Sequence, residues 1–175
     1  MAYVPFYEKF PEIAEKETRV ITSIADPELP AGKYVLIDAY CNDAGCDCRR
    51  VFFNVMCEET GKLMAVIAYG WESPEFYAKW YGRSDPKIIN ELKGPVLNAF
   101  SPQSKLAPVL LKKIEEYAIS DKQYMERIKR HYSMFRDLVD KESDKKAYVM
   151  PDRKVKISRN EPCPCGSGKK CCMEE

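Results

Sequence analysis

Half of the cysteines in this chain lie near its C-terminus, at spacings suited to holding a metal ion. The chain has eight cysteines among 175 residues, and four of them fall within the ten positions from Cys163 to Cys172. The surrounding residues are too polar to build a hydrophobic core. Four thiolates closing on one tetrahedral Zn²⁺ would fold the segment, because metal binding supplies about 10–16 kcal/mol in zinc-finger peptides.

A second group, Cys41, Cys46 and Cys48, has a C-x4-C-x-C spacing between two predicted strands. In a tight loop this spacing brings three sulfurs within chelating reach, and we predict a second zinc ion there. The alternative is a set of three structural or reactive thiols without a metal. In a cytosolic protein, clustered cysteines are metal ligands more often than disulfides.

Zinc takes four ligands, so the second group needs one more. The only histidine, His131, falls on the apolar side of a predicted helix, and we predict it as the fourth ligand, which would staple the strands to that helix. A lone inward histidine is otherwise a hydrogen-bonded core residue. The other candidates for the fourth position are Cys57, Asp43, Asp47 and a water molecule.

Catalysis at this second group is a rival hypothesis. Three protein ligands and an open position could activate a water molecule, with Asp38 or Glu72 as the base. A Cys–His nucleophilic pair is another form of the same idea. Both forms require an activating neighbour that the sequence does not identify.

The C-terminal segment Arg159–Cys172, with its core Cys-Pro-Cys-Gly-Ser-Gly-Lys-Lys, resembles the SEC-C zinc-binding motif. This motif is best known at the C-terminus of the bacterial SecA translocation ATPase, and it also ends many otherwise unrelated proteins. The resemblance implies one zinc ion bound through Cys163, Cys165, Cys171 and Cys172. Five residues separate Cys165 from Cys171, a shorter spacer than the family usually has. A disordered tail or redox-labile thiols are the alternatives.

Strand-like segments precede helical ones along the chain. Four stretches are rich in β-branched residues or alternate in polarity, and short turns connect the last three. They predict an antiparallel meander of three or four strands: Thr18–Ile24, Lys33–Tyr40, Arg50–Glu58 and Lys62–Tyr69. The loop Tyr40–Arg50, which contains Cys41, Cys46 and Cys48, and the segment Tyr69–Glu72 are weakly similar to uncharacterised domains that precede SEC-C tails. This resemblance implies no activity.

Helix signals follow the strands. Ser73-Pro74 and Asp85-Pro86 combine an N-cap with a proline at the first helical position, and Gly82 and Gly94 mark the ends. Ser104 is predicted to cap the next helix, whose apolar stripe is Leu106, Leu110, Ile114 and Tyr117. Ser120-Asp-Lys-Gln123 reads as a capping box that opens a long helix with Tyr124, Ile128, His131, Phe135 and Leu138 on one face.

Composition limits the functions that the chain can have. Hydrophobic residues make up 45%, which is enough for a core, and the net charge of +1 provides no global attraction to nucleic acid or anionic lipid. Local basic residues on the long helix (Arg127, Lys129, Arg130 and Arg136) and the aromatics Tyr77, Trp80 and Tyr81 could contact RNA. At helical spacing such residues more often form a solvated face and a core, respectively.

These observations predict an α+β domain over residues 1–140, a charged linker over 141–156 and a zinc-binding tail over 157–175. We see no signal peptide and no apolar run long enough to cross a membrane, so we expect a cytoplasmic protein without membrane insertion. The leading hypothesis is a non-enzymatic, zinc-stabilised adaptor whose tail docks a protein partner. RNA or ribosome binding and a metalloenzyme at Cys41, Cys46 and Cys48 are the alternatives.

Overall fold

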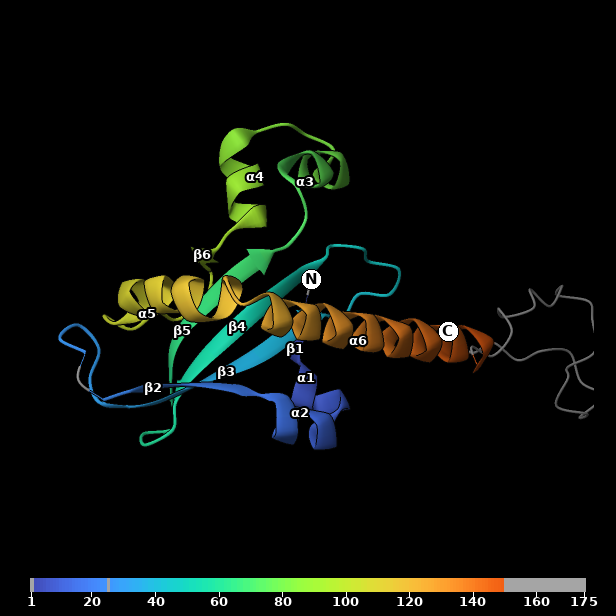
Figure 1. The fold of residues 1–175 in the computed structure, drawn as a ribbon. Helices are drawn as coiled ribbons and strands as arrows, with labels where there is room; N and C mark the ends of the chain where they lie inside the picture. Colours follow the sequence, from blue (N-terminus) through green and yellow to red (C-terminus); the bar gives the residue numbers. More distant parts are fainter. Residues whose placement is uncertain (1, 25, 150–175) are drawn as a thin grey trace, which may run out of the picture. The chain divides into compact units, whose positions relative to one another are not determined.

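The computed structural model describes residues 2–24 and 26–149, which form an antiparallel sheet flanked by helices (Figure 1). This confirms the predicted α+β class. The four predicted strands correspond to β2 (Arg19–Ser23), β3 (Gly32–Cys41), β4 (Arg50–Cys57) and β5 (Lys62–Gly70). Two short strands, β1 (Tyr3–Pro5) and β6 (Val96–Leu97), were not predicted, because such short segments carry no readable alternation.

The described strands form one six-stranded sheet in the order β1-β3-β4-β5-β6, with β2 also paired to β3. β2 to β5 are the predicted meander, each antiparallel to the next. β1 extends the same edge of β3 beyond β2, because Tyr3 lies opposite Cys41 whereas Arg19 lies opposite Leu36. This arrangement brings the N-terminus beside the cysteine-bearing end of β3.

Four short helices flank the strands: α1 (Phe6–Lys9), α2 (Pro11–Glu17), α3 (Pro74–Tyr81) and α4 (Pro86–Lys93). The predicted caps of the last two are present. The Ser73 hydroxyl accepts the Phe76 N–H at 3.3 Å, and the Asp85 carboxylate accepts the Lys87 N–H at 2.9 Å. α3 ends at Gly82 in the left-handed conformation that favours glycine.

The remaining helices are α5 (Ala107–Ile114), the π-helix η1 (Glu115–Ile119) and α6 (Lys122–Val149). The wide turn of η1 changes the helical phase, so the predicted apolar residue Tyr117 is exposed and Ala118 is buried instead. Asp121 caps α6, accepting the Gln123 and Tyr124 N–H groups at 3.0 and 3.1 Å. The predicted cap, Ser120, instead donates its hydroxyl to the Glu116 carbonyl.

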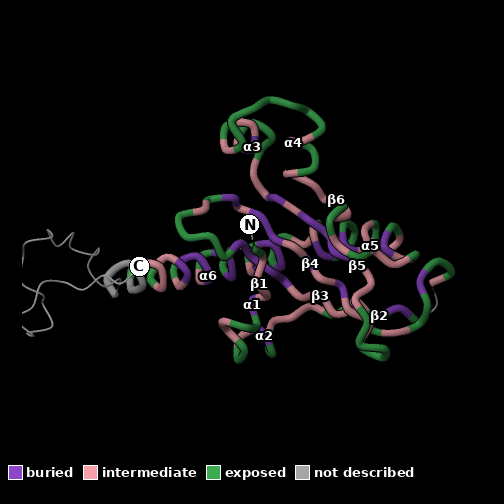
Figure 2. Tube along the Cα trace, turned by 180° about the vertical axis from the view of Figure 1, so that it is seen from behind, coloured by how far each residue is buried: buried purple, intermediate pink, exposed green. Residues whose placement is uncertain are grey.

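The core lies between α5, α6 and one face of the sheet (Figures 1 and 2). Aromatic contacts link the two layers, because Phe53 of β4 packs on Tyr124 and Tyr40 of β3 packs on Phe135. The predicted inward face of α6 is largely confirmed: Ile128, His131 and Phe135 are buried. One face of the sheet is therefore covered by this core, and the second face and the ends of the sheet are left for contacts with other elements of the fold.

α6 continues to Val149, so the segment predicted as a linker begins inside a helix. The compact unit of the chain is Met1–Ser143, and residues 144–149 belong to a second unit whose other residues lie outside the described part. The helical residues after Asp140 include three lysines, one glutamate and one alanine, which favour helix without needing an apolar stripe. Periodicity alone therefore could not mark the end of α6.

Candidate metal centre

The three cysteines of the first cluster lie together at one end of the sheet, in the connection from β3 to β4. Cys41 is the last residue of β3, and Cys46 and Cys48 belong to the loop before β4. Gly45 and Arg49 adopt left-handed conformations, with φ of 69° and 46°, which reverse the loop locally. The sheet thus fixes the first cysteine, and the two reversals bring the others to it.

The sulfur atoms of these cysteines all lie within 4.8 Å of one another. Zn–S bonds of about 2.3 Å at tetrahedral angles place two sulfurs about 3.8 Å apart, so small side-chain rotations would close the group on an ion. Cys41 and Cys48 are buried, and Cys46 is partly exposed. The three thiols can therefore hold a metal ion, and sulfur ligands favour soft metals.

Backbone N–H groups are directed at all three sulfurs. Each sulfur accepts a hydrogen bond from the residue two positions further along: Cys41 from Asp43, Cys46 from Cys48, and Cys48 from Arg50. Hydrogen bonds of this kind stabilise the thiolate form and orient the sulfurs. The loop backbone is thus arranged for negatively charged sulfur.

The three thiols share their protons unequally. The hydrogen bond from Cys48 is the main cause that lowers the pKa of Cys41 to about 6, and it outweighs the opposing effect of burial. The same hydrogen bond, together with burial, raises the pKa of Cys48, and burial raises the pKa of Cys46. A bound divalent cation would take the place of the retained protons, because thiolate is the form that coordinates metals.

Helix α6 holds the cysteine loop through Arg136, which is only 7% exposed. Its Nη1 donates to the carbonyl oxygens of Cys41 at 3.0 Å and Asp43 at 2.9 Å. Its Nη2 donates to Asp140 Oδ1 at 2.5 Å, and that oxygen also accepts the Gly45 N–H at 2.9 Å. Sequence analysis placed Arg136 on a solvated, charged face of the helix, because charged residues of both signs are interspersed there.

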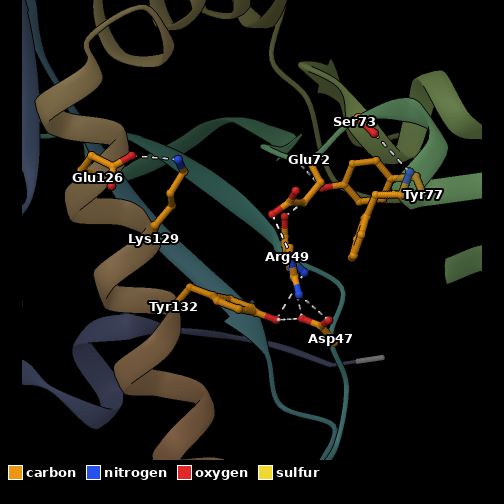
Figure 3. A network of polar contacts seen from close by, with 9 residues as sticks. Asp47, Arg49, Glu72, Ser73, Tyr77, Glu126, Lys129 and Tyr132 are labelled. Atoms are coloured by element: carbon orange, nitrogen blue, oxygen red, sulfur yellow. Dashed lines mark hydrogen bonds and ion pairs between the residues drawn. The ribbon is translucent and has the colours of Figure 1, made fainter. Parts of the chain in front are cut away.

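Arg49 anchors the other side of the loop (Figure 3). Its guanidinium lies between two carboxylates, with Nε 2.9 Å from Asp47 Oδ1 and Nη1 3.1 Å from Glu72 Oε1. Its backbone N–H donates to the Tyr132 hydroxyl of α6 at 3.3 Å, and its carbonyl accepts the Tyr77 hydroxyl of α3 at 2.9 Å. Two helices therefore fix the residue between Cys48 and β4.

Among the described residues, no histidine, carboxylate or further cysteine joins the three sulfurs as a fourth ligand. Cys57 lies at the far end of β4, where its thiol donates to Glu59 at 3.3 Å; a rise of about 3.3 Å per residue separates it from the cluster by about 20 Å. The Asp47 carboxylate is held by Arg49. The Tyr3 hydroxyl is a polar side-chain neighbour of the group, 3.9 Å from Cys48 Sγ.

The prediction that His131 supplies the fourth ligand is not supported by its position. Its Nδ1 lies 2.9 Å from Asp38 Oδ2, and its Nε2 lies 2.8 Å from Glu17 Oε2. Its ring also stacks on Phe6 at 4.0 Å. Both nitrogens are thus occupied by carboxylates, and His131 is the hydrogen-bonded core residue that sequence analysis gave as the alternative.

The side chains required by the catalytic hypothesis are similarly occupied. Asp38 contacts His131 and also the Tyr40 hydroxyl at 2.8 Å, and Glu72 pairs with Arg49. A Cys–His pair would need a free ring nitrogen beside a sulfur, and His131 offers none. Both candidate bases and the histidine therefore act as partners in hydrogen bonds and ion pairs within the fold.

Basic residues of α6 take part in ion pairs within the fold, and two of them share one carboxylate, that of Glu17. Tyr77 is buried and Trp80 packs against the core, as expected for helical spacing, whereas Tyr81 is exposed. Each cation on α6 that sequence analysis considered for phosphate contact has a carboxylate partner. The pairs are Arg127–Glu17, Arg130–Glu17, Lys129–Glu126 and Arg136–Asp140.

The four cysteines of the predicted tail site, Cys163, Cys165, Cys171 and Cys172, lie outside the described residues. The helices within residues 2–24 and 26–149 include none with the length and apolar character needed to span a bilayer. No protein-family model matches the chain, and comparisons with curated proteins and with solved structures find no match.

Proposed function

We propose that the chain is a zinc protein with two sites, of which Cys41, Cys46 and Cys48 form the first. The observation that carries this proposal is the convergence of three sulfurs within 4.8 Å, each receiving a backbone N–H. Zinc suits such a set because it combines tetrahedral geometry with thiolate ligands. A water molecule or an added ligand would complete the coordination.

We assign this first site a structural role. A metal there would cross-link the end of β3 to the start of β4, in a loop that Arg136 and Arg49 already tie to the surrounding helices. The engagement of Asp38, Glu72 and His131 in other contacts favours this role over catalysis. Closing the loop with metal bonds would stabilise the folded state relative to the unfolded chain.

We further propose that the chain acts as an adaptor, with the SEC-C-like tail as its docking module for a protein partner. Support comes from the sequence of the tail, and from the ion pairs of α6, which engage the basic residues considered for contact with RNA phosphates. The second zinc ion would be held by Cys163, Cys165, Cys171 and Cys172. RNA or ribosome binding through the basic residues of the tail is the competing outcome.

Metal analysis of the purified full chain tests the two sites together. We expect about two zinc equivalents in the parent, about one in Cys48→Ser, about one in Cys163→Ser and none in the double variant. Cys57→Ser is the matched control, because its thiol lies at the far end of β4, and it should retain two. A parent with one equivalent that survives Cys48→Ser would disprove the first site.

Docking is tested by comparing the proteins that co-purify with the parent, Cys163→Ser and Cys57→Ser, with and without ribonuclease. A docking tail requires a partner that is lost from Cys163→Ser only and is retained after ribonuclease treatment. Identical partners for all three chains would refute docking. Loss of the partner upon ribonuclease treatment would instead assign the tail to RNA.

A further inference from the structure

A cavity of about 580 Å³ lies on the face of the sheet opposite the core. Its walls come from β1, β4 and β5, from α4, and from β6 with the residues that follow it. They include Tyr3, Arg50, Phe52, Ala68, Leu92 and Ala99. A cavity of this volume falls in the range of small-molecule sites.

The strand register explains why these side chains share one face. Phe52 lies opposite Ala68, and residues directly opposite in an antiparallel pair point to the same side. Tyr3 stacks on Phe52 with ring centroids 3.8 Å apart. At Gly94 a Cβ atom would come within 2.3 Å of the Ala68 carbonyl oxygen, so only glycine lets the α4–β6 segment approach the sheet this closely.

Two ionisable residues line this cavity, Arg50 and the exposed Glu91 of α4, and Arg50 forms no ion pair with a carboxylate among the described residues. The residue is 9% exposed. Its Nη2 donates to the Glu91 carbonyl at 3.1 Å, and its Nε has no hydrogen-bond partner. Its guanidinium also lies 5.5 Å from the centre of the Phe52 ring. A buried cation normally has an anionic partner, because desolvating an unpaired charge is costly.

The neighbouring Arg49 is an arginine of the same loop whose charge is paired with carboxylates. It contacts two carboxylates, Asp47 and Glu72, although it is the more exposed of the two arginines. Arg50 is more buried and contacts none. The difference identifies Arg50 as the group in this region that lacks an anion, and the adjoining cavity as the place where one can bind.

We propose that this cavity binds a small carboxylate with an apolar body. The carboxylate would accept hydrogen bonds from the terminal Nη groups of Arg50, because Nε itself is closed to solvent, and guanidinium groups are suited to such charge-assisted contacts. The apolar body would lie against the Tyr3–Phe52 stack, Ala68 and Leu92. This assignment goes beyond the proposed function, and the metal site adjoins the cavity at Tyr3 and at Arg50, whose backbone N–H donates to the Cys48 sulfur.

Calorimetric titration of the zinc-loaded full chain tests the proposal with octanoate and octan-1-ol, which differ in the head group alone. We expect saturable binding of one octanoate, at least about tenfold tighter than octanol, because charge-assisted hydrogen bonds reach that magnitude. Arg50→Met should weaken octanoate binding by about tenfold or more and bring it level with octanol. Equal affinities in the parent, or no saturable binding of octanoate, would overturn the proposal.

Two further variants separate an effect on ligand binding from misfolding and from loss of zinc. Ala99→Trp places a bulky ring at an exposed position of the cavity wall, so it should abolish octanoate binding without changing the zinc content or the melting temperature. Arg83→Met, at an exposed position between α3 and α4, is the matched arginine control and should bind as the parent does. Retention of parental affinity in Arg50→Met would refute the role of the guanidinium.

Discussion

Helix α6 contacts the sheet and the cysteine loop through two groups of polar residues, which we call the His131 clamp and the Arg136 clamp. In the His131 clamp, the imidazole lies between the carboxylates of Asp38 and Glu17. In the Arg136 clamp, the guanidinium and its partner Asp140 contact the backbone of the cysteine loop. The first joins side chains that are distant in sequence, and the second fixes the path of a loop.

The two clamps differ in how buried the groups are that would lose a hydrogen-bond partner if one side chain were removed. Both ring nitrogens of His131 lie within hydrogen-bond distance of a carboxylate oxygen. Loss of one member leaves a buried hydrogen-bonding group without its partner, and Asp38 is only 4% exposed. The loop around the Arg136 clamp is open to water at Asp43 and Gly45. We therefore expect the His131 clamp to govern stability and the Arg136 clamp to govern metal affinity.

The largest expected effect is that of Asp38→Ala on the free energy of unfolding. Removing one partner of a buried charged pair costs about 3–5 kcal/mol, and zinc bound at Cys41, Cys46 and Cys48 should remain at about one equivalent in folded protein. Urea unfolding followed by circular dichroism measures the first quantity. Asp137→Ala, exposed on α6, is the control. A loss below about 1 kcal/mol would show that Asp38 is not a buried ionic partner.

Much of the architecture was predictable because its signals are local. The strand meander follows from alternation and short turns, and the starts of α3 and α4 follow from Ser73-Pro74 and Asp85-Pro86. The convergence of Cys41, Cys46 and Cys48 was equally local, since the eight positions from Cys41 to Cys48 contain all three. Strand alternation, helix caps and cysteine spacing all depend on residues that are close together in the sequence.

The clamps themselves were not predictable, because their members are remote in the chain. His131 lies 93 positions from Asp38 and 114 from Glu17. An inward histidine, and three cysteines with one coordination position unfilled, suggested a single site. The predicted burial of His131 is confirmed. Its partners depend on the rotation of α6 against β3 and α2, which no spacing within α6 encodes. The contacts of Arg136 with carbonyl oxygens of the cysteine loop, 93 and 95 positions away, could not be predicted for the same reason.

The second expected effect separates the clamps by metal affinity. Arg136→Met should weaken zinc binding at the first site by about 10–100-fold, because groups that orient the ligands contribute that much. The Cys163→Ser background removes the proposed tail site, so competition with a chromophoric chelator would report on the loop alone. His131→Asn, assayed where it is folded, should bind zinc within about twofold of the parent. Equal losses in both variants would refute the division of roles between the clamps.

The smallest expected effect concerns the pH dependence of the His131 clamp. Partial burial alone would raise the pKa of Glu17, but its hydrogen bond with His131 and the charge of Arg130 outweigh burial and hold the pKa below its usual value of 4.5. A carboxyl group with a lowered pKa stabilises the fold fully above its unfolded pKa, and that contribution is lost as pH falls through the lower folded value.

Glu17→Gln should therefore be less stable than the parent at neutral pH, and the gap should narrow as pH falls below about 4.5. Urea midpoints measured from pH 7 to pH 3 would follow the gap. Metal loss in acid affects both chains alike and cancels in the difference. Glu15→Gln, exposed on the same helix, should show no such narrowing. A gap that stays constant with pH would mean that Glu17 contributes packing rather than charge, and the His131 clamp would then rest on Asp38 alone.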